Sequence, residues 1–126
     1  MSYDISIHVK VEGCGKYAQI AVPEYDSPTY NLGEMLRACM DWDFRTSKED
    51  ENGEYQVCYY PCSYVIEKVE RGIRELRLNG KAYKKYNPPN GWGNIDGVLL
   101  ALESLRKCIY EQAVEIPIEC LYMSWV

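Results

Sequence analysis

The chain of 126 residues has a single histidine, His8, and lacks the common signatures of catalysis and of phosphate-binding loops. A histidine-based triad would have to use His8, and no serine stands in a Gly-x-Ser-x-Gly elbow. No Gly-x4-Gly-Lys-Ser/Thr loop is present, and no Gly-x-Gly-x2-Gly run follows a strand pattern. The sequence therefore disfavours serine-hydrolase chemistry and the common mononucleotide and dinucleotide folds.

Long apolar runs and a secretory signal pattern are also missing. No segment approaches the roughly 18 to 20 apolar residues that a membrane helix needs. The first residues alternate polar and apolar types instead of showing a basic region followed by an apolar stretch. We therefore expect a cytoplasmic protein with free thiols.

The six cysteines are then best interpreted as small apolar core residues. Cys62, at the start of a predicted helix, is the one thiol whose acidity the helix end is expected to raise. Cys58 and Cys62 would need two further ligands for zinc, and paired Cys-x2-Cys knuckles are absent. We therefore expect no metal ion and no cofactor.

Basic residues are fewer than acidic residues, 14 against 19, and the formal net charge is -5. This charge disfavours direct binding to nucleic acid or to an anionic membrane. The acidic excess is partly local to residues 41–54, which we interpret as a solvated loop, with docking on a basic protein as the alternative. Asp41 and Asp43 within it flank Trp42, but a metal-dependent hydrolase needs further ligands that the sequence does not identify.

Strand patterns occupy both ends of the chain. Alternating residues in 3–22, interrupted by a turn with two glycines, predict a β-hairpin with His8 on its polar, exposed side. Residues 54–60 have the β-branched and aromatic content of another strand. Residues 116–126 carry apolar side chains on both faces, which predicts an interior strand beside the first one.

Helical spacing of apolar residues occurs three times, over about 32–39, 62–80 and 95–112. Asn79-Gly80 is predicted to end the second helix, whose charged residues are expected to face solvent. We predict a single α+β domain over residues 1–126, with an antiparallel or mixed sheet of about three to five strands and two main helices packed on one face.

Residues 86–96, YNPPNGWGNID, allow two interpretations. In the first, the prolines and glycines only direct the chain, and Asn94 caps the next helix by accepting a bond from the amide of Asp96 or Gly97. In the second, Trp92 presents an aromatic plate beside free backbone amides, which suits a base and a phosphate. Asp96 in the first helical turn argues against an anion there.

Three motifs give the chain a resemblance to a known family. SYDI spans residues 2–5, TYNLGEMLR spans 29–37, and NPPNGWG spans 87–93 before a helix with a leucine ladder. Together they resemble a family of small proteins encoded by bacteriophages and prophages of Gram-positive bacteria. The resemblance implies a phage-related setting, in which the expected cytoplasm is that of the infected or lysogenic bacterial host, and it implies no particular activity. The acidic loop at 45–54 is not a feature of that family.

The motifs bring together polar and aromatic residues of the kind that line a pocket, and we predict a ligand site with no catalytic residues. Its predicted members are Thr29, Tyr30, Asn31, Arg37, Asn87, Asn90 and Trp92. Stacking on aromatic rings and pairing of Arg37 with phosphate would suit a small nucleotide.

Three functions stay open, apart from a structural role in the virion. The first is a phage accessory protein that sequesters a nucleotide-type immune signal. The second is an inhibitor that docks its acidic surface on a basic host defence protein such as a CRISPR nuclease, with residues 41–54 as the discriminating feature. The third, an enzyme acting on nucleotides through Asp41 and Asp43, is the least supported. The sequence leaves a homo-oligomer open.

Overall fold

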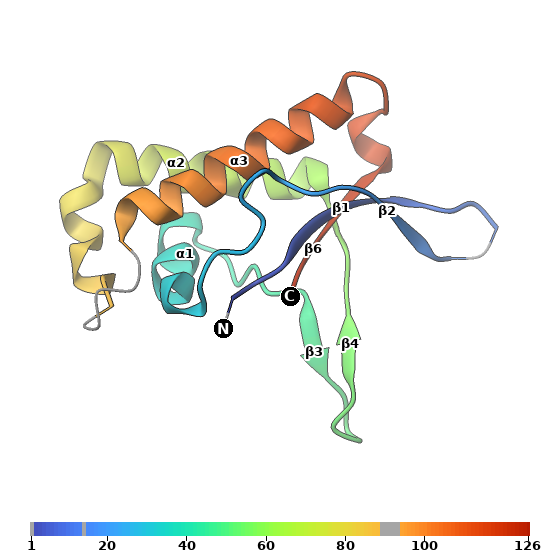
Figure 1. Ribbon diagram of the computed structural model, residues 1–126, viewed down its shortest axis with the longest axis horizontal. Helices are drawn as coiled ribbons and strands as arrows, with labels where there is room; N and C mark the ends of the chain where they lie inside the picture. Colours follow the sequence, from blue (N-terminus) through green and yellow to red (C-terminus); the bar gives the residue numbers. More distant parts are fainter. Residues whose placement is uncertain (1, 14, 89–93) are drawn as a thin grey trace.

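The computed structural model describes residues 2–13, 15–88 and 94–126 (Figure 1). Four strands form the main sheet in the order β2-β1-β6-β5, and each neighbouring pair is antiparallel. The strands are β1 (Ile5–Lys10), β2 (Tyr17–Ala21), β5 (Tyr60–Pro61) and β6 (Leu121–Trp125). The predicted α+β class, the N-terminal hairpin and the pairing of the last strand with the first are therefore confirmed.

Two long helices pack against one face of this sheet (Figure 1). They are α2 (Cys62–Tyr83) and α3 (Ile95–Ala113), and a short helix, α1 (Gly33–Met40), follows a 3-10 turn at Tyr30–Leu32. The predicted end of the second helix at Asn79-Gly80 coincides with a break in the helix, although a further helical segment follows it. Asn79 has non-helical angles (φ -127°, ψ 31°) and kinks the chain, but the helix resumes and continues to Tyr83.

The charged side of α2 does more than face solvent. The Arg71 guanidinium donates to the carbonyl oxygen of Cys39 at the end of α1, and Glu70 accepts a bond from the hydroxyl of Tyr110 on α3. The prediction of a solvated face is therefore wrong for Arg71, whose bond to α1 is partly buried, whereas the bond of Glu70 to Tyr110 lies at an exposed position.

The acidic segment is a second hairpin, not an irregular loop. β3 (Ser47–Glu49) pairs with β4 (Tyr55–Val57), and the hairpin extends away from the rest of the molecule (Figure 1). The predicted strand at 54–60 is thus divided between two sheets. The C-terminal strand is also shorter than predicted, because Ile118–Cys120 form a 3-10 turn before β6. Local strand propensity does not reveal that residues 54–60 leave one sheet and enter another.

The core lies between the sheet and the helices. Ile5, Ile7, Met123 and Trp125 are buried on the helix-facing side of β1 and β6. Gly72 lets α1 and α3 approach α2, since a Cβ there would stand 2.8 Å from Leu102 Cδ1 and 2.9 Å from Met40 Cγ. The described residues include no helix that combines the length and apolarity needed to cross a membrane.

His8 is buried, which contradicts the predicted surface position. Its Nε2 lies 2.8 Å from Ser6 Oγ and 3.0 Å from Ser124 Oγ, and the ring of Tyr59 packs against it at a centroid distance of 4.8 Å. Tyr17 stacks on Tyr59 in turn, at 4.1 Å. Alternation places His8 on the side of β1 away from the helices, but residues distant in sequence cover that side. Burial lowers the pKa of His8 below its usual value.

Candidate functional site

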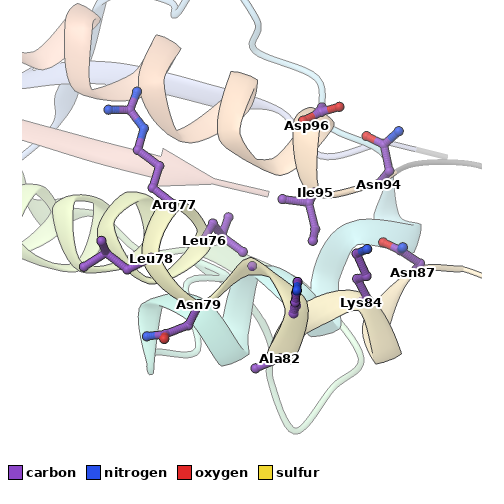
Figure 2. A pocket seen from close by; sticks show the side chains of 12 residues that line it. Leu76, Arg77, Leu78, Asn79, Ala82, Lys84, Asn87, Asn94, Ile95 and Asp96 are labelled. Atoms are coloured by element: carbon purple, nitrogen blue, oxygen red, sulfur yellow. The ribbon is translucent and has the colours of Figure 1, made fainter.

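A cavity of about 810 Å³ lies between the C-terminal part of α2 and the start of α3 (Figure 2). The kink at Asn79 changes the direction of the last part of α2, and a 3-10 turn at Lys84–Tyr86 follows that part. The amide of Asn87 closes that turn by donating to the carbonyl oxygen of Lys84 at 3.0 Å. The chain thus leaves α2 at an angle, and the space beside it opens toward the first turn of α3.

The cavity has an apolar base and a polar rim. Leu76, a buried residue, and Ile95, a half-buried one, contribute the apolar surface. Figure 2 shows the side chains of Lys84 and Asn87 directed into the space below Ile95. A volume of this size matches a small-molecule site, and such sites combine apolar walls with a few polar groups.

Positive charge is concentrated along this part of the chain. Residues 76–95 contain Arg77, Lys81, Lys84 and Lys85 and no aspartate or glutamate, although the whole chain carries a formal charge of -5. Arg77 forms an ion pair with Glu103 of α3, so its charge is partly neutralised. Lys81 and Lys84 are exposed cavity residues for which no ion pair is found among the described residues. The cavity is therefore suited to an anion.

The start of α3 is capped as the sequence predicts. The side-chain oxygen of Asn94 accepts a hydrogen bond from the amide of Gly97 at 3.0 Å. The adjacent Asp96 lines the rim but, in Figure 2, points away from the space between Leu76 and Ile95. The cap occupies one of the free amides of this helix end, so phosphate recognition would depend chiefly on the lysines.

The seven predicted site residues do not all lie at this cavity. Asn87 lines it, whereas none of the residues in 29–37 does. Asn90 and Trp92 lie outside the described residues. The cavity residues that the sequence reasoning missed include Leu76, Lys81, Lys84 and Ile95. The absence of acidic residues from 76–95 was the signal that could have identified them.

The TYN segment forms its own local structure. The hydroxyl oxygen of Thr29 accepts a bond from the amide of Asn31 at 3.5 Å and caps the 3-10 turn, while the Asn31 side chain is exposed. Tyr30 packs on Tyr3, with ring centroids 4.4 Å apart. Arg37 pairs with Asp43 at 3.3 Å. These contacts account for the fold of the segment and leave the Tyr30 ring 37% exposed.

The expectation of a more acidic Cys62 thiol is wrong. Burial raises the pKa of Cys62 to about 12, and burial likewise raises that of Cys39 to about 12. The thiol lies inside the core, so desolvation destabilises the thiolate by more than the helix N-terminus stabilises it. Within the described ranges, no group of three or more histidine, cysteine or acidic side chains has the arrangement of a metal site.

No protein-family model, no curated protein and no solved structure matches this chain. Its function is therefore inferred from the cavity, the charge around it and the surfaces of the fold.

Proposed function

We propose that this protein binds a small, phosphate-bearing nucleotide in the cavity between α2 and α3, and that it acts as a phage accessory protein by sequestering such a signal. One observation supports the proposal above the others. A run of 20 residues with four basic and no acidic side chains, 76–95, borders a cavity with an apolar base in an otherwise acidic protein.

The cavity offers a distinct contact for each part of a nucleotide. The ammonium groups of Lys81 and Lys84 can donate to phosphate oxygens as mobile point charges. The amide of Asn87 can both donate to and accept from the edge of a base. Leu76 and Ile95 provide apolar surface for the flat face of the base. Binding of this kind requires no catalytic group.

Removal of the two lysines should abolish most of the affinity. For the double variant Lys81→Ala/Lys84→Ala, we expect at least about a tenfold higher Kd, because each lost charged hydrogen bond contributes about 1.5–3 kcal/mol. The measurement is thermal shift followed by calorimetry against a panel of cyclic and linear nucleotides. A ligand at about 100 times its Kd should stabilise the wild-type fold by about 2.7 kcal/mol.

The matched control is Lys16→Ala, which removes an exposed lysine near the tip of the first hairpin, away from the cavity. The control should bind like the wild type. In bacteria that carry the defence system and express the protein, the wild type and the control should protect an infecting phage from the defence, and the double variant should not. The proposal fails if no nucleotide in the panel raises the Tm of the wild type, or if the double variant protects phage as well as the parent.

Docking on a basic defence protein is a second candidate, and the β3–β4 hairpin favours it. No residue from Glu49 to Val57 is buried, so the hairpin contributes little to the core. Its tip is nevertheless ordered, because the Asp50 carboxylate accepts bonds from the amides of Asn52 and Glu54, each at 2.9 Å. Tyr55 is 68% exposed beside acidic side chains. An ordered hairpin of this composition is suited to an electropositive partner surface.

Deletion of residues 49–54, with two glycines closing the gap, tests this candidate. The Tm of the deletion variant should stay close to that of the parent, because the hairpin buries no core residue. If docking is the function, the variant should lose inhibition of the defence protein. A milder variant, Glu51→Gln/Glu54→Gln, should weaken inhibition only partially. The loss of inhibition should be larger at low salt, where charge–charge attraction is less screened. Full inhibition by the deletion variant would eliminate the docking candidate.

A further inference from the structure

Two arginines and three aromatic rings form a separate cluster on the structure, which we call the arginine–tyrosine cluster: Tyr3, Tyr30, Arg37, Phe44 and Arg45. The ring of Tyr3 contacts the other two, with centroid distances of 4.4 Å to Tyr30 and 5.1 Å to Phe44. None of the five residues lines the α2–α3 cavity.

Both guanidinium groups are held in place by aromatic and polar contacts. Arg37 lies 5.4 Å from the centroid of Phe44, and its Nε donates to Asp43 at 3.3 Å. Arg45 lies 5.9 Å from the centroid of Tyr30, and its Nε donates to the Ser47 hydroxyl at 3.0 Å. An arginine braced in this way loses less rotamer entropy when it binds a ligand.

The charges of both guanidinium groups act on the hydroxyl of Tyr3. Burial raises the pKa of Tyr3, and the charges of Arg37 and Arg45 oppose that rise. Gly33 leaves room for Arg37 beside this hydroxyl, because a Cβ at that position would stand 2.5 Å from the Tyr3 hydroxyl oxygen and 3.2 Å from Arg37 Nη1. The packing therefore keeps both positive groups on the same side of the fold.

The outer part of the cluster is open to solvent. The side chain of Arg37 is 41% exposed, and that of its partner Asp43 is 79% exposed. An exposed ion pair with one long contact contributes little to stability. A phosphate group can accept two parallel bonds from one guanidinium and a further bond from a second, so it can compete with the Asp43 carboxylate for Arg37.

We propose that Arg37 and Arg45 form a second ligand site, which takes a phosphate monoester from a molecule that also contains a planar ring, and that Asp43 occupies Arg37 until the ligand binds. The phosphate replaces the Asp43 carboxylate at Arg37 and accepts from Arg45, while the ring packs on the exposed surface of Tyr30. The site is independent of the cavity between α2 and α3, and it does not rest on the function proposed for that cavity.

The test uses calorimetry on the Lys81→Ala/Lys84→Ala background, in which the cavity lysines are absent. Inorganic phosphate, phenyl phosphate and adenosine 5′-monophosphate are the probes. Both ring-bearing probes should bind more tightly than inorganic phosphate. If adenosine monophosphate binds more tightly than phenyl phosphate, the source of the phosphate is a nucleotide. If phenyl phosphate binds more tightly, the source is a phosphorylated tyrosine.

Substitutions should change the affinity in both directions. Arg37→Ala and Arg45→Ala should each weaken phenyl phosphate binding by about tenfold, since each removes a charged hydrogen-bond donor. Arg37→Lys, which keeps the charge without the planar fork, should also weaken it. Asp43→Asn should tighten binding several-fold because it removes the competing carboxylate. A merely structural role for Asp43 would predict no gain.

Lys107→Ala is the matched control, because Lys107 is an exposed cation with its own acidic partner, Glu111, on α3. This variant should bind like the background, and circular dichroism melting should show which variants remain folded. The proposal is overturned if the background protein binds none of the three probes, if folded Arg37→Lys and Arg45→Ala bind phenyl phosphate unchanged, or if Asp43→Asn weakens binding.

Discussion

Replacement of Trp125 by alanine should lower the free energy of unfolding by about 3–5 kcal/mol, the usual cost of removing a large aromatic side chain from a core. Trp125 is fully buried on β6, opposite Ile5 of β1. Its ring centroid lies 4.3 Å from that of Phe44 and 6.4 Å from that of Tyr3. Alanine would leave a void where the sheet, the segment after α1 and the N-terminal strand meet.

Urea unfolding followed by circular dichroism measures this change. Trp125→Phe should cost much less than the alanine variant, because it keeps an aromatic ring and removes a buried indole Nε1 that has no hydrogen-bond partner among the described residues. Tyr55→Ala, at an exposed position of the hairpin, is the surface control and should change stability by less than about 0.5 kcal/mol. Equal losses from Trp125→Ala and Tyr55→Ala would contradict the central position of Trp125.

The second large effect is expected at Gly72, where Gly72→Ala should destabilise the fold by about 1–3 kcal/mol through overpacking. The added Cβ would meet Leu102 Cδ1 at 2.8 Å, Met40 Cγ at 2.9 Å and Cys39 Sγ at 3.2 Å. These atoms belong to α3 and α1, so the methyl group would push two helices away from α2. Replacing glycine by alanine in a helix usually stabilises the fold. A loss of stability in Gly72→Ala would therefore indicate close packing at this position.

Gly80→Ala on the same helix is the matched control. A Cβ at Gly80 meets nothing within 4 Å in the part of the chain that the structure describes, so the substitution should be neutral or stabilise the protein by up to about 1 kcal/mol through helix propensity. Chemical unfolding of the two variants under identical conditions gives the comparison. Close helix packing at Gly72 would be refuted if Gly72→Ala were as stable as Gly80→Ala.

Several elements follow from periodicity alone. The apolar residues of β1 alternate, and the stripe from Val98 to Ile109 on α3 repeats at helical spacing, so both elements could be predicted with their buried sides. Asn94 was predicted as a cap because its side chain has the right length to reach an amide three residues ahead. Each of these features depends on neighbours along the chain.

The errors share a different cause. His8 was predicted to be exposed because alternation gives the side of a strand but not what covers that side, and here Tyr59 covers it. Cys62 was predicted to be acidic because the helix end is visible in the sequence, whereas the core that surrounds the thiol is not. The β3 strand was missed because its partner, β4, is needed to stabilise so short and polar a segment.

The sequence by itself determined the α+β class, the approximate places of the long elements and the charge excess of each segment, because periodicity and composition are local properties. Only the tertiary structure decided which residues meet. It placed Lys84 and Asn87 with Ile95 at the α2–α3 cavity, and it placed Tyr30 and Arg37 with Tyr3 in the arginine–tyrosine cluster. Such groupings depend on the kink at Asn79 and on helix packing at Gly72, which bring together side chains far apart in the chain.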